Sequence, residues 1–226
     1  MILEHLFGLE FRRRRLLAKA PPGPLRDYLA TPFPASNAAS TEVAYLALDL
    51  ETTGGDPDRD EIVSFGWVCV NGNNIDLATA QHHVVRVQSA ISATSAVIHK
   101  ITDDESERGG SLKDALDMLL LALAGRVLIA HRAQTELGFV GRACERIYGG
   151  RVLIPTVDTL RIAIRIEERQ QRPTQRGTLR LHALRHKYNL PRYPAHNALS
   201  DALSAAELFL AFQAERAGTM PLKYWM

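Results

Sequence analysis

The chain has 226 residues, of which 46% are hydrophobic and 23% charged, with a formal net charge of +2. These values are typical of a globular domain, and they exclude a disordered chain, a fibre and a strongly basic protein that coats nucleic acid. Two cysteines, Cys69 and Cys144, are too few for a disulfide framework and lack metal-ligand spacing, which favours a reducing, cytoplasmic setting. No run of about 18 apolar residues occurs, so no membrane contact is predicted.

The first 43 residues are predicted to form a basic arm and a proline-containing tether outside the main domain. Residues 1–20 have the pattern of a short amphipathic helix with four consecutive arginines, Arg12–Arg15, near its end. Pro21, Pro22 and Pro24 end this helix, because proline lacks an amide donor and clashes inside a helix. Residues 25–43 are predicted to be the tether. The arginines suit a nucleic-acid backbone, a partner or solvent, and the sequence leaves these alternatives open.

Three consecutive antiparallel strands are predicted next. The first begins at Tyr45 and is followed by a turn at 54–57, and the second covers 61–70. The residues 71–74, Asn-Gly-Asn-Asn, are a hairpin signal, and a third strand is expected within 75–87.

Helices and strands alternate in the remainder of the chain. Helices are predicted at 111–124, 134–148, 158–169, 178–188 and 197–217, and strands at 126–130 and 152–157. Three consecutive strands followed by alternating helices and strands predict an α/β domain with one mixed five-stranded sheet flanked by helices. The domain is expected to cover 44–217, with a C-terminal tail at 218–226.

Two acids lie in the first predicted strand, one residue apart. Because strand side chains alternate, Leu46, Leu48 and Leu50 face one way, and Asp49 and Glu51 face the other. At about 3.3 Å rise per residue, the two acids lie about 7 Å apart along the backbone, within reach of one divalent cation. A solvated acidic face on an edge strand is the alternative.

Two further acids, Glu136 and Asp201, lie on the apolar faces of predicted helices. Apolar residues follow each acid at i+4, i+7 and i+11: Val140, Ala143 and Ile147 after the first, Ala205, Leu208 and Phe212 after the second. A buried carboxylate is costly unless it is paired, neutralised or bound to metal, so a salt bridge to arginine is the alternative. Together with the strand acids, they favour a shared cation site.

Four carboxylates supply only oxygen ligands, which suit Mg²⁺ or Mn²⁺ better than zinc. Such a site, with room for two ions about 3.5–4 Å apart, is typical of phosphodiester cleavage. His196 precedes the helix of Asp201, with Asn197 as the expected N-cap. A histidine at this position suits a general base, because imidazole can take up a proton near neutral pH, and the alternative is a surface residue.

Three segments resemble the exonuclease motifs of the DEDD superfamily, in its histidine subclass. They are 49–54 (DLETTG), 131–139 (HRAQTELGF) and 196–202 (HNALSDA). A fourth segment, 98–103 (IHKITD), resembles that family's substrate-lining region. The resemblance covers about residues 45–214 and is nearest to the proofreading epsilon-type subunits of bacterial DNA polymerase III.

The resemblance implies a ribonuclease H-like fold and 3′-to-5′ exonuclease activity with two Mg²⁺ or Mn²⁺ ions, releasing nucleoside 5′-monophosphates. It implies that Asp49 contacts both ions, that Glu51 and Asp201 complete one site, and that Glu136 holds the other ion. His196 is the implied general base. Three more residues match positions that line the terminal nucleotide: Thr52, Thr53 and His99.

The second motif departs from the usual family pattern, His-Asn-Ala-x-Phe-Asp. Here Arg132 replaces the asparagine, Thr135 the aromatic residue and Glu136 the aspartate. An arginine at this position suits either a phosphate or solvent. Loss of the aromatic residue is expected to weaken packing around the site, which affects affinity more than chemistry.

The sequence therefore predicts a stand-alone, metal-dependent 3′-to-5′ exonuclease that acts on single-stranded DNA 3′ ends. A DNA polymerase or a repair protein is the expected partner. Two alternatives stay open: an exoribonuclease of the same superfamily, and a catalytically weak module that binds nucleic acid or docks on a polymerase.

Overall fold

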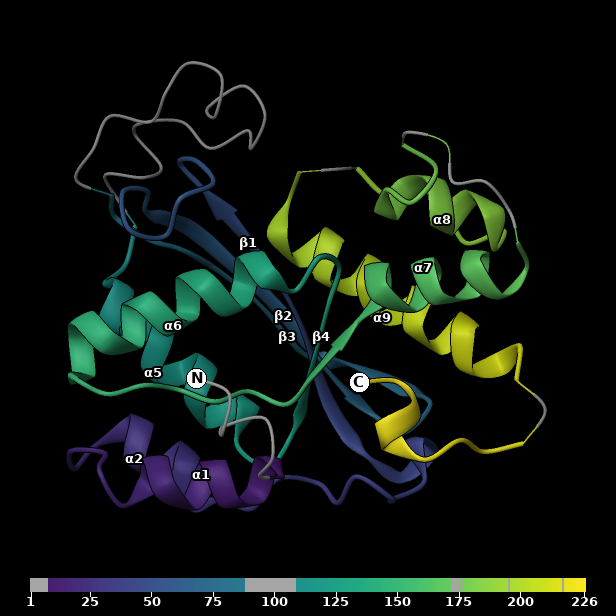
Figure 1. The fold of residues 1–226 in the computed structure, drawn as a ribbon. Coiled ribbons are helices and arrows are strands. Elements are labelled where there is room, and N and C mark those ends of the chain that lie inside the picture. The colour runs from purple at the N-terminus through teal and green to yellow at the C-terminus, as the bar shows by residue number, and fades with distance from the viewer. Residues whose placement is uncertain (1–7, 88–108, 172–174, 176, 195, 217) are drawn as a thin grey trace.

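A central strand, β1 (Ala44–Thr52), organises the sheet in the computed structural model (Figure 1). It pairs antiparallel with β2 (Ile62–Asn71) and parallel with β4 (Val127–Ala130). The edges are β3 (Asn74–Val84) and β5 (Thr156–Asp158), which gives the order β3-β2-β1-β4-β5. This confirms the predicted mixed five-stranded sheet with its three antiparallel strands first. The structure describes residues 8–87, 109–171, 175, 177–194, 196–216 and 218–226.

Helices cover both faces of the sheet (Figure 1). On one face lie α5 (Leu112–Leu123) and α6 (Gln134–Tyr148). The other face is covered by α9 (Ala198–Ala214), with α7 (Thr159–Arg169) and α8 (Leu181–Lys187) packed beside it. The predicted helices are therefore present. In the described part of the chain, none is long and apolar enough to cross a bilayer.

The two faces of β1 carry two different cores, as the alternation in the sequence predicts. Leu46, Leu48 and Leu50 belong to the core beneath α5 and α6. Tyr45 and Ala47 belong to the core beneath α9, and the ring of Tyr45 packs edge-on against Phe209 at 5.2 Å between centroids. Because Asp49 and Glu51 follow on this second face, they lie towards α9.

Gly66 allows α9 to lie directly on the sheet. It is paired with Asp49 across β1 and β2. A Cβ atom at Gly66 would lie 2.0 Å from the backbone nitrogen of Leu199 and 2.1 Å from the carbonyl carbon of Ala198. These distances are far below van der Waals contact, so only glycine permits this approach. The first turn of α9, which carries Asp201, therefore lies on β2 beside Asp49 of β1.

The N-terminal region packs on the domain, and the first residues of the predicted tether form a helix. The expected helix near the start is α1 (Leu9–Leu17), and it is followed by α2 (Pro24–Ala30). Leu25, Tyr28 and Leu29 of α2 are at most 1% exposed and belong to the core beneath α5 and α6. Pro24, one of the prolines predicted to end the first helix, stands in the first turn of α2, where its missing amide hydrogen costs nothing.

The C-terminal residues pack in the same way. Trp225 is 2% exposed and lies edge-on against Phe209, with 5.6 Å between ring centroids. Tail and N-terminal region also meet, since Ala39 forms a β-bridge with Pro221. The predicted boundaries between arm, domain and tail stay a prediction, but residues 24–30 and 222–225 contribute to the two cores.

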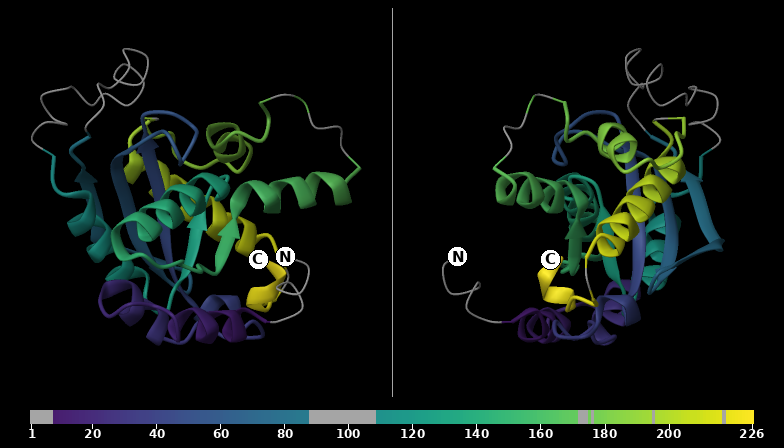
Figure 2. Two further views of the ribbon diagram at one scale, coloured as in Figure 1. Left: turned by 60° about the vertical axis from the view of Figure 1, so that its left-hand side comes forward. Right: turned by 90° about the vertical axis from the view of Figure 1, so that its right-hand side faces the viewer.

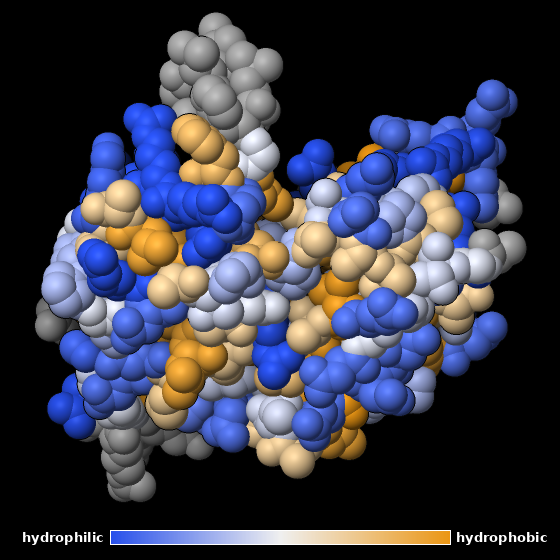
Figure 3. All heavy atoms as spheres, turned by 90° about the horizontal axis from the view of Figure 1, so that it is seen from below, coloured by the Kyte–Doolittle hydropathy of each residue, from blue (hydrophilic) through white to orange (hydrophobic). Residues whose placement is uncertain are grey.

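The N-terminal helices and the predicted acids lie at opposite ends of the sheet. Figure 2 shows α1 and α2 at one end of the molecule and the turn after β1 at the other. Seen from the end with α1 and α2, hydrophilic side chains predominate at the surface and apolar ones form small groups (Figure 3). The predicted acids lie at the opposite end, where β1 finishes.

One strand is shorter than predicted. A strand was expected over 152–157, whereas β5 covers only Thr156–Asp158. Pro155 has no amide hydrogen for the ladder, and the carbonyl of Leu153 accepts a hydrogen bond from the Tyr28 hydroxyl of α2 at 2.9 Å. Residues 152–155 therefore lie outside β5, and Leu153 contacts α2 instead.

Candidate metal centre and active site

Three carboxylates converge at the end of β1. Asp49 and Glu51 come from the strand, and Asp201 comes from the first turn of α9. One oxygen of each lies within 4.8 Å of the others. The proximity that the sequence predicts for these acids is therefore present, because the close approach at Gly66 places the helix acid beside the strand acids.

Bringing these acids together is electrostatically unfavourable without a cation. Burial raises the pKa of Asp49 well above its usual range, and the nearby charges of Glu136, Asp201 and Glu51 raise that pKa further. Burial also raises the pKa of Asp201. A divalent cation would remove this repulsion. The donor set contains oxygen only, so the residues present fit Mg²⁺ or Mn²⁺.

Glu136 lies close to this group but outside it. It occupies the first turn of α6, is 3% exposed, and its Oε2 has no hydrogen-bond partner within the described residues. Burial raises the pKa of Glu136 to about 8, and the charges of Asp158 and Glu51 add to this shift. A buried carboxylate oxygen without a partner is costly, which fits a ligand for a second cation. That role stays a prediction.

His196 is exposed and directly precedes α9. Its backbone is left-handed, with φ of 65°, and its amide donates a hydrogen bond to Oδ2 of Asp201 at 3.0 Å. Asn197 is the N-cap, as predicted, and its Oδ1 accepts from the Ser200 amide at 3.1 Å. The hydrogen bond from the His196 amide opposes the rise in the pKa of Asp201 that burial causes. The role of His196 as a base stays a prediction.

The two threonines predicted to bind substrate lie where β1 ends: Thr52 is its last residue, and Thr53 begins the turn that follows. The Thr52 hydroxyl donates to the carbonyl two residues later at 2.7 Å. The Thr53 hydroxyl accepts from the Glu61 amide at 3.0 Å and lies 3.5 Å from Oδ1 of Asp60. These contacts fix the turn beside the acids. His99, the third predicted substrate residue, lies outside the described residues.

Asp158 is a site residue that the sequence did not reveal. It ends β5 and caps α7, accepting from the Leu160 amide at 2.9 Å. Its carboxylate also accepts from the amides of Arg132 at 3.0 Å and Ala133 at 3.2 Å. Asp158 therefore fixes the turn from β4 into α6, and with it the start of the helix that carries Glu136. Only its capping role had a signal in the sequence, an aspartate directly before a helix.

His131, the first residue of the second motif, is partly buried and contacts Thr159. Nδ1 of His131 lies 2.9 Å from the Thr159 hydroxyl, which itself donates to the carbonyl of Ala130 at 3.2 Å. Burial lowers the pKa of His131. This histidine connects the ends of β4 and β5, so its contacts here are structural.

A family profile described as Exonuclease (RNase_T) matches residues 46–209 of this chain. The match covers most of the chain, and the chain belongs to this exonuclease family. The predicted DEDD family is thus confirmed, while the histidine subclass stays a prediction that rests on His196.

Individual relatives fit this assignment. The chain is 29% identical over 171 residues to a PolC-type DNA polymerase III of Thermotoga maritima, and 28% identical over 174 residues to the 3′-5′ exonuclease DinG of Staphylococcus haemolyticus. These matches cover 76% and 75% of this chain but only 12% and 18% of the relatives. The chain therefore corresponds to a small part of much longer proteins.

Solved structures share the fold. Cell-death related nuclease 4 aligns with a TM-score of 0.67 at 15% identity, covering 80% of this chain and 68% of that one. E. coli exonuclease I, in complex with a 5cy-dT13 oligonucleotide, aligns with a TM-score of 0.65 at 12% identity, covering 77% of this chain and 41% of that one. The predicted ribonuclease H-like fold is confirmed.

Proposed function

We propose that this chain is a metal-dependent exonuclease that removes nucleotides in the 3′-to-5′ direction from single-stranded DNA and releases nucleoside 5′-monophosphates. The observation that carries the proposal is the convergence of Asp49, Glu51 and Asp201 in a chain of the exonuclease family. The direction is supported by the name of the DinG relative, and the substrate by the oligonucleotide complex of exonuclease I.

In this proposal, Asp49, Glu51 and Asp201 hold one Mg²⁺ or Mn²⁺ ion, and Glu136 serves a second ion together with Asp49. When bound, such ions lower the pKa of water and stabilise charge on the leaving oxygen. The chain's contribution is to fix the four carboxylates on two rigid helices and one central strand. Asp158 and Gly66 keep both helix ends in place.

His196 takes the proton of the attacking water at an imidazole nitrogen. The water oxygen forms a bond to phosphorus, and the bond from phosphorus to the 3′ oxygen of the preceding nucleotide breaks. Thr52, at the end of β1, and Thr53, at the start of the turn, lie beside this position, where they contact the terminal nucleotide. A positioned base of this kind contributes about 10²- to 10⁴-fold to the rate.

End-labelled oligonucleotides test the proposal directly. Single-stranded DNA and RNA of one sequence, labelled at the 5′ end, are incubated with Mg²⁺, Mn²⁺ or a chelator. A ladder of shortened DNA products with either metal, and none with chelator, is expected. Digestion of RNA alone would favour the exoribonuclease alternative, and no digestion of either would contradict the proposed activity.

The weak binding module is retained as a second candidate because of one observation. Glu136 stands where the family pattern has aspartate, and it lies outside the group of three acids. Strand binding without digestion would support that candidate. The PolC-type relative supports a polymerase partner, and two buried free cysteines support the proposed cytoplasmic setting.

A further inference from the structure

A cavity of about 760 Å³ lies at the β5 edge of the sheet. It lies between the start of α6, the end of β5, the first turn of α7 and the C-terminal residues. Its lining combines two arginines with polar and apolar side chains: Arg132, Gln134, Leu137, Asp158, Leu160, Arg161, Trp225 and Met226 are among the residues that form it. Such a lining suits a negatively charged ligand that also has an apolar part.

The strand register places this cavity next to the metal centre. β4 pairs with β1 through Ala47 and Ile129, and β5 pairs with β4 through Asp158 and Ala130. Asp158 is therefore level with Leu48, one residue before Asp49, and lies two strand spacings, about 10 Å, to the side of β1. Gln134 and Leu137, which line the cavity, come from the same turns of α6 as Glu136 but from a different face of the helix. A strand held at the metal centre can continue into this space.

Both arginines of the cavity lack a partner in the described part of the chain. Arg132 and Arg161 are exposed, and neither guanidinium has a hydrogen bond or an ion pair there. The next arginines along α7 are used differently. Arg165 donates to the carbonyl of Trp225 at 3.1 Å, and Arg169 donates to the Tyr224 hydroxyl at 2.6 Å. The cavity thus retains two cations that the fold does not use.

The backbone of Arg132 is unfavourable for arginine. Its φ is 67°, a left-handed conformation that asparagine adopts more readily and that typically costs other residues about 1 kcal/mol or more. Asp158 stabilises this turn by accepting from the amides of Arg132 and Ala133. A charged residue kept at a strained position beside an active site points to a function for that charge.

We propose that Arg132 and Arg161 bind backbone phosphates of the substrate strand, upstream of the linkage that is cleaved. The inference rests on the proposed exonuclease function and adds the path of the strand. Guanidinium groups bind phosphate through paired, charge-assisted hydrogen bonds. Leu160 and Met226 supply apolar surface for the bases next to those phosphates.

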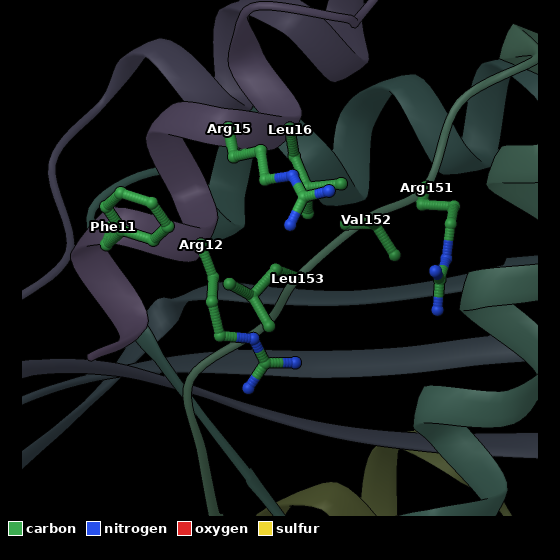
Figure 4. Close-up of a pocket in the computed structure, with 7 residues that line it drawn as sticks. All are labelled: Phe11, Arg12, Arg15, Leu16, Arg151, Val152 and Leu153. Atoms are coloured by element: carbon green, nitrogen blue, oxygen red, sulfur yellow. The ribbon is translucent and has the colours of Figure 1, made fainter. Parts of the chain in front are cut away.

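The test compares two double variants that remove the same charge. The first is Arg132→Asn with Arg161→Gln, in which asparagine suits the left-handed turn, so folding is retained. The control is Arg12→Gln with Arg15→Gln on α1. These two arginines also line a cavity, together with Arg151, at the other end of the sheet (Figure 4). Thermal unfolding checks that both variants are folded.

Binding of a labelled single-stranded DNA oligonucleotide is measured by fluorescence anisotropy in chelator, over a series of salt concentrations. Each lost phosphate contact lowers the slope of log affinity against log salt by about 0.7 for single strands, so about 1.4 is expected for the first variant. The control variant is expected to keep the wild-type slope. Equal slopes in all three proteins, or a wild type without metal-independent binding, would overturn the proposal.

Kinetics separates this inference from the proposed function. The p-nitrophenyl ester of thymidine 5′-monophosphate has no upstream phosphate, whereas an oligonucleotide has several. The ratio of kcat/KM for the oligonucleotide to that for the ester is expected to fall in Arg132→Asn/Arg161→Gln and to hold in the control. A wild type that cleaves neither substrate contradicts the exonuclease function itself. A wild type that cleaves both, with an unchanged ratio in the variant, contradicts only the strand path.

Discussion

The acids at the end of β1 are placed for chemistry at the expense of stability. Asp49 faces three other carboxylates, and its pKa is raised by burial and by their charges. A side chain in this position weakens the folded state when no cation is present. The same arrangement is what a cation site needs, so function and stability make opposite demands on this residue.

Replacing Asp49 by asparagine is expected to separate these demands. Asp49→Asn keeps the shape but removes one charge, so the metal-free protein should unfold at a higher temperature than wild type. Nuclease activity should fall about 10²- to 10³-fold, because a metal clamp supplies several kcal/mol of transition-state stabilisation. Thermal unfolding in chelator and oligonucleotide digestion with Mg²⁺ measure the two effects. A variant with wild-type turnover would show that Asp49 is not a ligand.

His196 can be tested without disturbing its turn. Asparagine tolerates the left-handed backbone that the structure gives His196 at φ of 65°, yet it has no titratable group near neutral pH. His196→Asn is therefore expected to lower kcat by about 10²- to 10⁴-fold while binding of single strands is retained. Single-turnover kinetics and anisotropy check the two expectations. Wild-type kcat in this variant would assign the base to another group.

At the scale of elements, the approach of α9 to the sheet decides where Asp201 lies. A methyl group at Gly66 would meet the backbone of Leu199 and Ala198, which cannot move aside as a side chain can. Gly66→Ala is expected to cost about 1–3 kcal/mol of stability, typical of overpacking, and to lower metal affinity by moving Asp201. The matched control is Gly141→Ala in α6, where a Cβ atom meets nothing within 4 Å.

Denaturant unfolding and calorimetric Mn²⁺ titration measure these effects. Gly141→Ala should be neutral or slightly stabilising, since alanine favours a helix interior over glycine. If Gly66→Ala bound Mn²⁺ as tightly as wild type, the close approach of α9 would not determine the geometry of the acids.

Periodicity made most elements predictable, because each depends on residues near in sequence. The alternating leucines of β1 and the apolar stripe beyond Asp201 are such local patterns. Contacts between distant segments were not predictable in this way. The Asp158 carboxylate accepts a hydrogen bond from the Arg132 amide. Gly66 contacts the first turn of α9, which lies more than a hundred residues later in the sequence. The helix α2 was missed for another reason, since Pro32, Pro34, Ser36 and Asn37 favoured a loop over residues 25–43.

For the whole molecule, the carboxylates link stability to pH and to metal. The pKa of Glu136 is raised from 4.5 to about 8, and those of Asp49 and Asp201 are raised as well. A folded state that holds protons more tightly than the unfolded chain loses stability as pH rises between the two pKa values. Without metal, stability should therefore be highest near the ordinary carboxyl range and fall as pH rises from about 4.5 towards 8.

Divalent metal should reverse this trend, because it binds the ionised carboxylates of the folded state and stabilises it by mass action. Thermal unfolding from pH 5 to pH 8, with chelator or with Mn²⁺, measures the trend without metal and the trend with metal. In chelator, Tm is expected to decline with pH. The increase in Tm produced by Mn²⁺ is expected to grow with pH. In Glu136→Gln the side chain at position 136 is uncharged at every pH. The decline of Tm with pH in chelator should therefore be weaker than in wild type, and the increase in Tm produced by Mn²⁺ should be smaller. A decline in Glu136→Gln as steep as in wild type would mean that Glu136 does not titrate with the cluster, and the second cation would need another ligand.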